Sequence, residues 1–268
     1  MEGPGIVRCQ ELLDGLGFDY GDNDGVYGPK TRKAVKDFQS KIGLKTDGIC
    51  GPKTWAAILD DADGDVDGDA PDPVGIIDIR NNHKPPRLYG YERKPLRVLG
   101  ICLHQTGCQM PRNPEKWGRL NAHIGITQEG KAILVNDFTD MIWHAQKLSM
   151  RTIGIEVEGN FYGVEGRPST LWKPGGGPDS LNPKTLTALA HVFEYLQDWF
   201  YKHSEWKYIF AHRQAFSGRV SDPGEQIWRQ VALPWMEITG ASDGGENHFI
   251  GSGNPIPAAW DIRYNNSF

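Results

Sequence analysis

Long apolar runs are absent from this chain of 268 residues, of which 38% are hydrophobic and 10% aromatic. A membrane-spanning helix needs about 20 consecutive apolar residues, and no run approaches that length, so we expect no membrane span. The opening residues, Met1 to Val7, lack both a basic segment and an apolar core. They therefore predict no secretory signal, and the overall composition is ordinary for a globular protein.

Cysteine is scarce, with four in the chain. They divide into Cys9 with Cys50 and Cys102 with Cys108, and neither pair has the Cys-x-x-Cys spacing of a zinc site or a redox motif. For Cys9 and Cys50 we expect buried free thiols, with a disulfide as the alternative. The cysteines therefore assign the protein to no redox compartment.

Basic residues are missing from residues 60–72, a segment that holds seven aspartates. The net charge of the whole chain is −5, so this run accounts for the acidity, and the charge indicates nothing about the partners of the flanking segments. Self-repulsion and the Gly and Pro content predict an extended linker, which we assign to residues 60–80. Asp63 to Gly68 begins like a calcium-binding loop, but its twelfth position is Val74 instead of glutamate, so we expect no Ca²⁺ there.

An internal repeat precedes the linker. Asp24–Thr31 and Asp47–Thr54 are identical at six of eight positions and begin 23 residues apart. In each copy a glycine turn is followed by proline, which is favoured at the first position of a helix, so helices are predicted from Pro29 and Pro52. A further amphipathic segment lies before the first copy. Residues 1–59 are therefore predicted to form a compact three-helix domain.

Two histidines end short apolar runs that have the character of buried β-strands. Leu96–His104 is the first run, and Tyr208–His212 is the second, followed by a loop that returns through Asp222-Pro-Gly. Strand ends hold side chains in fixed geometry. Two imidazoles and one carboxylate can hold a zinc ion and leave one position for water, whose pKa then falls to about 7. We therefore predict a zinc hydrolase with His104, His212 and Asp222 as metal ligands.

Two further segments lie between these histidines in the sequence. Asn121–Val135 predicts a β-hairpin around a four-residue turn, Gln128–Lys131. Thr152–Asn160 alternates apolar and polar residues, which predicts a strand with Glu156 and Glu158 on one face. We expect that face to look toward the metal.

Three other segments complete the pattern. Asn182 and Pro183 predict the start of a long helix, whose apolar stripe we assign to the core. Residues 161–179, rich in Gly and Pro, predict a loop beside the cleft. The segment 241–268 is predicted to be a tail that Trp260 anchors onto the preceding domain.

The run from about Leu96 to Glu237 resembles the zinc amidase family that includes bacterial N-acetylmuramoyl-L-alanine amidases, phage lysins and peptidoglycan recognition proteins. The resemblance implies an α/β fold with a mixed central β-sheet flanked by helices. It also implies that Glu156, in Ile-Gly-Ile-Glu-Val-Glu-Gly, is the catalytic carboxylate, which accepts a proton from water and delivers it to the departing amine. For Glu158 we expect a solvent-facing or salt-bridged side chain.

One family position differs in this chain. Bacterial members often carry a lysine two residues before the aspartate ligand, and Val220 stands there instead. Valine cannot stabilise an oxyanion, so the candidates are zinc alone, Arg219, Arg213 or His123. His123 and His144 stand where relatives also carry histidine; we predict that both line the cleft on the substrate side, with a structural role as the alternative. The remaining histidines have no motif around them and are expected to be solvated or structural: His83, His191, His203 and His248.

Residues 1–59 resemble the peptidoglycan-binding domain of many wall hydrolases. The shared pattern includes Gln-x-x-Leu at Gln10 to Leu13, Asp-Gly-x-(Phe/Tyr)-Gly at Asp24 to Gly28, Phe38-Gln39 and Gly43-Leu44. The resemblance implies binding to bacterial peptidoglycan. The residues assigned to this wall-binding motif are Asp24, Gly25, Tyr27, Gly28, Asp47, Gly48 and Gly51.

Together these resemblances imply a monomeric enzyme similar to phage endolysins, with one Zn²⁺ in a catalytic domain at residues 81–240. It would cleave the amide bond between N-acetylmuramic acid and the L-alanine of the stem peptide. Peptidoglycan is the expected partner, and no nucleic acid is expected. We expect synthesis in a host cytoplasm and release to the cell wall without a secretory signal. The alternatives are a recognition protein that binds peptidoglycan without cutting it and a zinc peptidase that cuts another wall amide.

Overall fold

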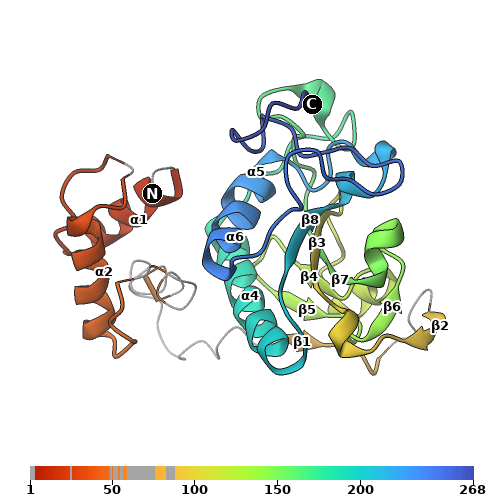
Figure 1. Cartoon of the computed structure of the whole chain (residues 1–268), viewed down its shortest axis with the longest axis horizontal. Helices are drawn as coiled ribbons and strands as arrows, with labels where there is room; N and C mark the ends of the chain where they lie inside the picture. The colour runs from red at the N-terminus through yellow and green to blue at the C-terminus, as the bar shows by residue number, and fades with distance from the viewer. Residues whose placement is uncertain are drawn as a thin grey trace. The chain divides into compact units, whose positions relative to one another are not determined.

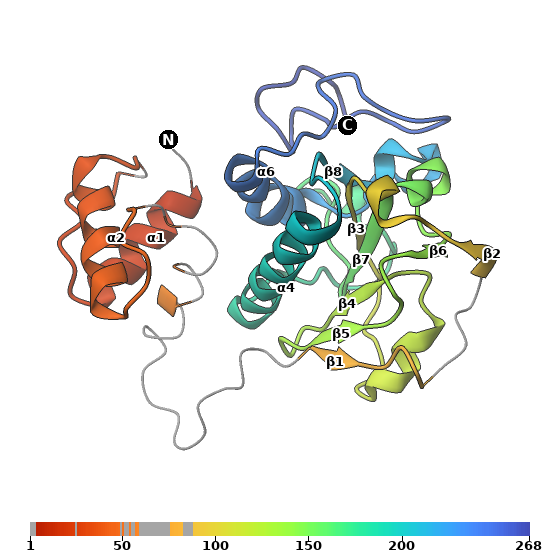
Figure 2. The same cartoon turned by 60° about the horizontal axis from the view of Figure 1, so that its bottom comes forward.

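The computed structural model describes residues 4–24, 26–48, 50, 54, 57–58, 76–82 and 88–268. It divides into two compact units, an N-terminal unit within residues 1–73 and a larger unit that holds most of residues 74–268 (Figures 1 and 2). The aspartate-rich run, with the calcium-like pattern from Asp63 to Gly68, lies outside the described residues. So do Gly25 and Gly51 of the wall-binding motif.

Helices form the described part of the N-terminal unit, α1 (Pro4–Gly15) and α2 (Pro29–Lys41). As predicted, α2 begins with proline at its first position. Leu13 and Phe38 are fully buried in the core cluster of this unit. The third predicted helix, expected from position 52, lies largely outside the described residues, although residues 54, 57 and 58 are helical.

The two copies of the repeat share one hydrogen-bonding device. In each, the Nε2 of a buried glutamine from the preceding helix donates to the aspartate and to the threonine of the copy that follows. The donor–acceptor distance to aspartate is 3.0 Å in both copies, and the distance to threonine is 3.3 Å in the first and 2.9 Å in the second. The two sets are Gln10–Asp24–Thr31 and Gln39–Asp47–Thr54.

A six-stranded mixed sheet forms the centre of the larger unit, in the order β1-β5-β4-β7-β3-β8. The pair β4 and β5 is antiparallel, and the other neighbours in the sheet are parallel. A separate antiparallel ribbon joins β2 to β6. The bounds are β1 (Ile77–Asp78), β2 (Leu88–Glu92), β3 (Gly100–Gln105), β4 (Ile124–Ile126), β5 (Ala132–Leu134), β6 (Asp140–Ile142), β7 (Thr152–Val157) and β8 (Tyr208–Ala211).

Helix α4 (Pro183–His203) begins as predicted. The Asn182 side chain accepts a hydrogen bond from the Thr185 N–H, and proline occupies the first turn. Phe193 and Leu196 of its apolar stripe are fully buried. In both views α4 lies beside α6 along the sheet (Figures 1 and 2). The remaining helical segments are α5 (Glu225–Ile227), a π-helical turn (Trp228–Ala232), α6 (Leu233–Thr239) and 3₁₀ turns at Pro95–Arg97, Pro114–Arg119, Gln146–Met150, Pro168–Thr170, His212–Gln214 and Ser217–Arg219.

The predicted hairpin is confirmed, because β4 pairs with β5 around a turn in which Gly130 has a φ of +81°. The predicted end of the linker is wrong. The sequence places Ile77 and Asp78 in the linker, but they form β1 and pair with β5. The physical reason is apolar burial. Ile79, which follows β1 directly, is buried in a cluster with Ile133 of β5.

The C-terminal segment packs onto the larger unit. Trp260 is fully buried, as predicted, and its Nε1–H donates to the Gly163 carbonyl. Ser242 also forms a bridge with Tyr208 of β8.

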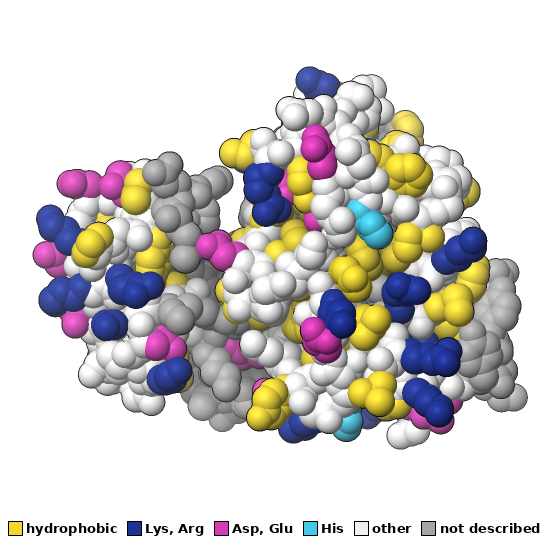
Figure 3. All heavy atoms as spheres, in the orientation of Figure 1, with side chains coloured by type: hydrophobic (Ala, Val, Ile, Leu, Met, Phe, Trp, Pro, Cys, Tyr) yellow, Lys and Arg dark blue, Asp and Glu magenta, His cyan; other side chains and the backbone are white. Residues whose placement is uncertain are grey.

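On the face shown in Figure 3, acidic and basic side chains are interspersed over the N-terminal unit. No helix in the described ranges has both the length and the apolar character that a bilayer crossing requires.

Candidate metal site and cleft

The sheet topology brings the two predicted histidine ligands together. His104 lies near the carboxyl end of β3, in which all six residues are buried, and His212 directly follows β8. These strands are parallel neighbours with Leu103 opposite Ala211. Side chains at the carboxyl ends of neighbouring parallel strands meet at one edge of the sheet. Residues more than 100 positions apart in the sequence therefore face each other.

Three potential ligand atoms converge at this edge. The Nδ1 atoms of His104 and His212 are 2.9 Å apart, and the His212 Nδ1 lies 3.0 Å from the Asp222 Oδ2. The second carboxylate oxygen, Oδ1, accepts a hydrogen bond from the Gln105 N–H at 3.0 Å, which ties the aspartate loop to β3. All three side chains are buried. The predicted trio therefore forms one cluster.

This donor set fits a zinc ion. Two imidazole nitrogens and a carboxylate oxygen are ordinary zinc ligands, and bonds of about 2.1 Å in a tetrahedral arrangement separate ligand atoms by about 3.4 Å. The observed separations of 2.9 and 3.0 Å are within about 0.5 Å of that spacing. Two imidazole lone pairs at 2.9 Å repel each other unless a proton or a cation lies between them, so the convergence favours a bound cation.

A second group could also hold a metal, because Cys102 and His144 both have ligand atoms near His104. The His144 Nδ1 lies 3.0 Å from the His104 Nε2. Cys102 is fully buried and does not line the cleft described below, and burial raises the pKa of its thiol well above the ordinary value. We therefore favour the group with Asp222 as the metal site, because that group lies at the cleft.

Glu156, the predicted catalytic carboxylate, lies directly opposite His104 on the neighbouring strand β7. Its Oε2 is buried and has no hydrogen-bond partner among the described residues. Burial, assisted by the negative charge of Asp222, raises the pKa of Glu156 to about 8, although the charge of Arg219 opposes the shift. A carboxyl group in this environment can hold a proton near neutral pH.

A cleft of about 450 Å³ opens over this group. Arg219 is the cation at the cleft whose charge reaches Glu156, and its guanidinium stacks on the Trp172 ring at 4.4 Å. The predicted loop at residues 161–179 therefore contacts a residue that lines the cleft, Arg219, through Trp172. Sequence reasoning missed this contact. The lining residues are Gln105, Thr106, Cys108, Met110, Arg119, Leu120, Asn121, Trp143, His144, Gln146, Glu156, His212, Phe216, Arg219 and Asp222.

Arg213, one of the alternative oxyanion donors, is not among the residues that line the cleft. Arg213 is buried, its guanidinium lies over the rings of Trp260 and Phe268, and it donates to the Val220 carbonyl at 2.7 Å. It therefore braces the loop that carries Asp222. Val220 itself is partly exposed, and Arg219 is left as the side-chain donor beside it.

The prediction that His123 lines the cleft is wrong. His123 is fully buried, its Nδ1 accepts from the Gly154 N–H at 2.9 Å, and its Nε2 lies 3.1 Å from the Asp140 carbonyl and 3.0 Å from Arg93. Both ring nitrogens are thus used within the fold, which is the structural alternative. His144 does line the cleft.

The prediction for Glu158 is also wrong. Its carboxylate is buried, and it accepts hydrogen bonds from the Met110 N–H at 2.6 Å and from the Gln128 N–H at 2.8 Å. Strand β7 ends at Val157. Glu158 therefore lies beyond the strand, and the alternation that places Glu156 on one face does not extend to it. It fixes two loops instead of facing solvent or a cation.

The other predicted site residues have structural contacts. In the wall-binding motif, the Tyr27 hydroxyl donates to the Gly48 carbonyl at 3.1 Å, which links the two copies of the repeat. The histidines without motifs lie apart from the metal group: His248 stacks on Phe210, His203 is exposed and His191 is half-buried, while His83 lies outside the described residues. All four cysteines are free thiols. The sulfur atoms of Cys9 and Cys50 are 3.5 Å apart.

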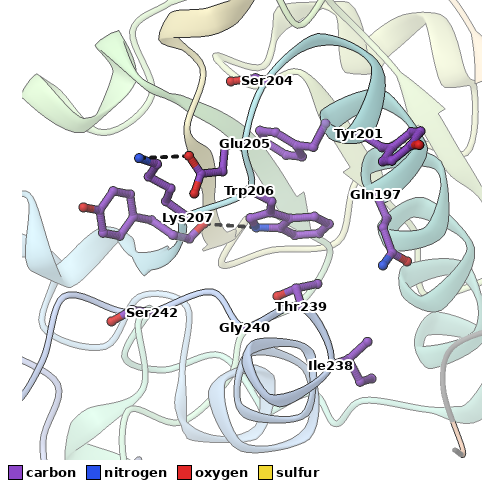
Figure 4. A pocket seen from close by; sticks show the side chains of 12 residues that line it. Gln197, Tyr201, Ser204, Glu205, Trp206, Lys207, Ile238, Thr239, Gly240 and Ser242 are labelled. Atoms are coloured by element: carbon purple, nitrogen blue, oxygen red, sulfur yellow. Dashed lines mark hydrogen bonds and ion pairs between the residues drawn. The ribbon is translucent and has the colours of Figure 1, made fainter.

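A larger hollow of about 610 Å³ lies between the ends of α4 and α6. Figure 4 shows its main polar contacts, the ion pair between Lys207 and Glu205 at 2.9 Å and the hydrogen bond from the Trp206 Nε1–H to the Tyr208 carbonyl at 3.2 Å. No histidine or cysteine lines it. Its lining therefore lacks the donor set found in the smaller cleft.

Comparison with known families agrees with this geometry. Residues 94–225 match the family model described as N-acetylmuramoyl-L-alanine amidase, and residues 2–58 match the model described as a peptidoglycan binding domain. The chain therefore carries a domain of the N-acetylmuramoyl-L-alanine amidase family, preceded by a peptidoglycan-binding domain. This composition supports a peptidoglycan hydrolase, and both predicted resemblances are confirmed.

Several solved structures are similar to the chain. The N-acetylmuramoyl-L-alanine amidase LysC from Clostridium intestinale shares 16% identity over 62% of this chain and 98% of its own, with a TM-score of 0.44. The Drosophila peptidoglycan recognition protein PGRP-LB shares 13% identity over 64% and 98%, with a TM-score of 0.43. The endolysin of Thermus scotoductus bacteriophage Ph2119 shares 15% over 62% and 99%, with a TM-score of 0.40. No curated protein sequence matches the chain.

Proposed function

We propose that the protein is a zinc-dependent N-acetylmuramoyl-L-alanine amidase that lyses bacterial cell walls in the manner of an endolysin. The scissile bond is the amide between N-acetylmuramic acid and the L-alanine of the stem peptide. The observation that carries this proposal is the convergence of His104, His212 and Asp222 beside Glu156. Of these four, all but the buried His104 line one cleft. The family match of residues 94–225 supports it.

In this mechanism His104 and His212 would hold the metal through Nδ1, and Asp222 would hold it through Oδ2. Zinc, when bound, supplies a Lewis acid that polarises a carbonyl and lowers the pKa of water. The hydrogen bond from the Gln105 N–H keeps the Asp222 carboxylate in place. The buried edge of the sheet limits solvent around these side chains, which strengthens their electrostatic interactions.

Glu156 moves the proton. Its Oε2 lies buried at the cleft without a hydrogen-bond partner among the described residues, so it is available to accept the proton that the attacking water loses. The same carboxyl group then delivers that proton to the departing nitrogen of L-alanine, whose expulsion as an anion is unfavourable. A pKa raised by burial suits both steps, because the group can be protonated and deprotonated near neutral pH.

Arg219 stabilises the negative charge that develops on the carbonyl oxygen. Replacing Arg219 with alanine is expected to lower kcat by about 10²-fold, because a preorganised donor at an oxyanion has that typical effect. Zinc content should remain unchanged. Arg119→Ala is the matched control, since Arg119 also lines the cleft and its loss removes the same charge. Equal kcat values for Arg219→Ala and the wild type, measured by release of L-alanine amino termini, would remove Arg219 from the mechanism.

The N-terminal unit holds the enzyme on its polymer. Gln39→Leu is expected to abolish retention on insoluble peptidoglycan, because the Gln39 amide group donates to Asp47 and Thr54 and accepts from the Gly48 N–H. Loss of these buried hydrogen bonds should destabilise this small unit by about 2–4 kcal/mol. Cosedimentation with purified cell walls measures retention.

Turnover of a soluble muropeptide should be unaffected in Gln39→Leu. The control is Lys33→Ala on the same helix, which removes only an exposed ion pair with Asp37 and should leave retention intact. Retention of Gln39→Leu at the wild-type level would show that the hydrogen-bonded repeat is not needed for wall binding.

A recognition protein that binds peptidoglycan without cutting it is the principal alternative. The complete ligand set, with an unpartnered carboxylate beside it, favours hydrolysis over recognition alone. A zinc peptidase that cuts another wall amide would use the same groups on a different bond. The products of digestion distinguish these three functions.

The test is mass spectrometry of purified peptidoglycan after digestion by the full chain, with a parallel sample that contains a zinc chelator. We expect free stem peptides that begin with L-alanine, together with glycan strands that lack peptide, and neither product with chelator. Undigested peptidoglycan in both samples would support recognition. Fragments cut within the stem or the cross-link would identify a peptidase.

A further inference from the structure

We propose that His144 is a positioning residue that fixes which nitrogen of His104 faces the metal. The inference rests on the proposed zinc hydrolase function. It concerns a chain of three groups that starts at the backbone of β7 and ends at the metal cluster: the Thr152 carbonyl, the His144 ring and the His104 ring.

The proton on His144 is assigned by its acceptors. The Nε2 of His144 lies 3.2 Å from the Thr152 carbonyl oxygen and 3.4 Å from the Thr152 hydroxyl oxygen, and that hydroxyl donates its own proton to the Leu148 carbonyl at 2.8 Å. A carbonyl can only accept. The Nε2 of His144 must therefore carry a proton, and in the neutral ring the Nδ1 has a lone pair.

The same reasoning carries the assignment to His104. The His104 Nε2 lies 3.0 Å from the His144 Nδ1, so it donates its proton to the lone pair there. In neutral imidazole only one nitrogen carries a proton. The Nδ1 of His104 therefore has its lone pair directed at the cluster, where the His212 Nδ1 is 2.9 Å away. A metal ligand needs that lone pair.

Strand β7 makes this arrangement possible. The His144 ring lies against Gly154, where a Cβ atom would be 2.7 Å from the His144 Cγ. The His144 N–H also donates to the Ser149 hydroxyl at 3.0 Å, which fixes the backbone of that segment. The glycine in Ile153-Gly154-Ile155 is thus required for His144 to reach His104.

The consequence is measurable as metal affinity. A hydrogen bond from the distal nitrogen of a ligating histidine fixes its tautomer and orientation, and losing such a partner typically weakens metal binding by about 10–100-fold. We expect His144→Leu to raise the zinc dissociation constant of the full chain by that factor. In His144→Asn, the Oδ1 can take the place of the His144 Nδ1 as an acceptor, so the affinity should return to within about threefold of wild type.

A third variant tests the same chain without changing a histidine. In Gly154→Ala the new Cβ atom would displace the His144 ring, and we expect zinc affinity to fall as it does in His144→Leu. Dissociation constants are measured by competition with a chelating dye, with the unfolding temperature of each zinc-free variant measured alongside. A purely structural role would lower the unfolding temperatures without separating the zinc affinities of His144→Asn and His144→Leu.

The outcomes distinguish this inference from the function on which it rests. If His144→Leu and His144→Asn bind zinc equally, the positioning role is refuted, while the zinc site can stand. If the wild-type chain binds zinc no better than His104→Ala, the metal assignment itself is refuted. If wild type and His144→Asn bind tightly while His144→Leu and Gly154→Ala bind weakly, the relay from Thr152 to the metal is supported.

Discussion

Replacing His212 with alanine is expected to lower hydrolysis of peptidoglycan by at least about 10³-fold and to reduce bound zinc below stoichiometric levels. His212 contributes the central atom of the cluster, because its Nδ1 lies 2.9 Å from the His104 Nδ1 and 3.0 Å from the Asp222 Oδ2. Without it, two ligands remain. A metal ion supplies several kcal/mol of charge stabilisation to the transition state, which corresponds to a rate factor of about this size.

The measurement combines a rate assay with metal analysis of the same preparation. His203→Ala is the control, because His203 is exposed at the end of α4 and lies outside the metal group. It should have wild-type activity and zinc content. A His212→Ala protein that lacks zinc and still keeps a tenth of the wild-type rate would contradict a metal-dependent mechanism.

Glu156→Gln is expected to lower kcat by about 10²–10⁴-fold, the usual contribution of a general acid–base group. Glutamine preserves the shape of the side chain but cannot accept and return a proton. Zinc affinity should be unchanged, because Glu156 lies opposite His104 on the neighbouring strand but is outside the ligand group. KM should change less than kcat, since the lost interaction belongs to the transition state.

Glu158→Gln is a matched control for that substitution. It removes a second buried carboxylate two residues further along, one that accepts from the Met110 and Gln128 N–H groups. We expect it to lower the free energy of unfolding and to leave kcat within about threefold of wild type. If both variants lose the same fraction of kcat, the loss reflects altered packing of this segment, and Glu156 has no special role in proton transfer.

The convergence of His104, His212 and Asp222 could be predicted from the sequence because it depends on local patterns. His104 and His212 each end a short apolar run, and parallel strands align such ends at one edge of a sheet. Asp222 lies in the loop after the second of these histidines, and the Pro-Gly pair that follows it in the sequence predicts that loop. Glu156 could be found by resemblance, since the alternation of residues along β7 identifies a face but not what that face meets.

Other features depend on contacts that no local pattern encodes. The His123 ring is hydrogen-bonded to the Gly154 N–H and the Asp140 carbonyl, whereas the His144 ring contacts His104. Nothing in the residues around either histidine indicates this difference. The glycine at position 154 was the available signal, because a missing side chain between two strand residues leaves room for a ring. Ile77 escaped prediction because a two-residue strand is too short to show alternation.

The repeat in the N-terminal unit could be recognised from sequence identity, but its hydrogen bonds to Gln10 and Gln39 could not be predicted. The amide groups of Gln10 and Gln39 lie 14 and 8 residues before the aspartates that they bind. Such spacing has no helical or strand periodicity, so only the folded chain brings the partners together. The same holds for Trp172, which reaches Arg219 from a long loop.

The central claim is that one zinc ion is held by His104, His212 and Asp222. Crystals of the full chain, measured on both sides of the zinc absorption edge, test it directly. We predict a single strong anomalous peak about 2.0–2.2 Å from the Nδ1 atoms of both histidines and from an Asp222 carboxylate oxygen. A zinc-loaded crystal with no peak at that position, or with its peak at Cys102 and His144 instead, would contradict the account.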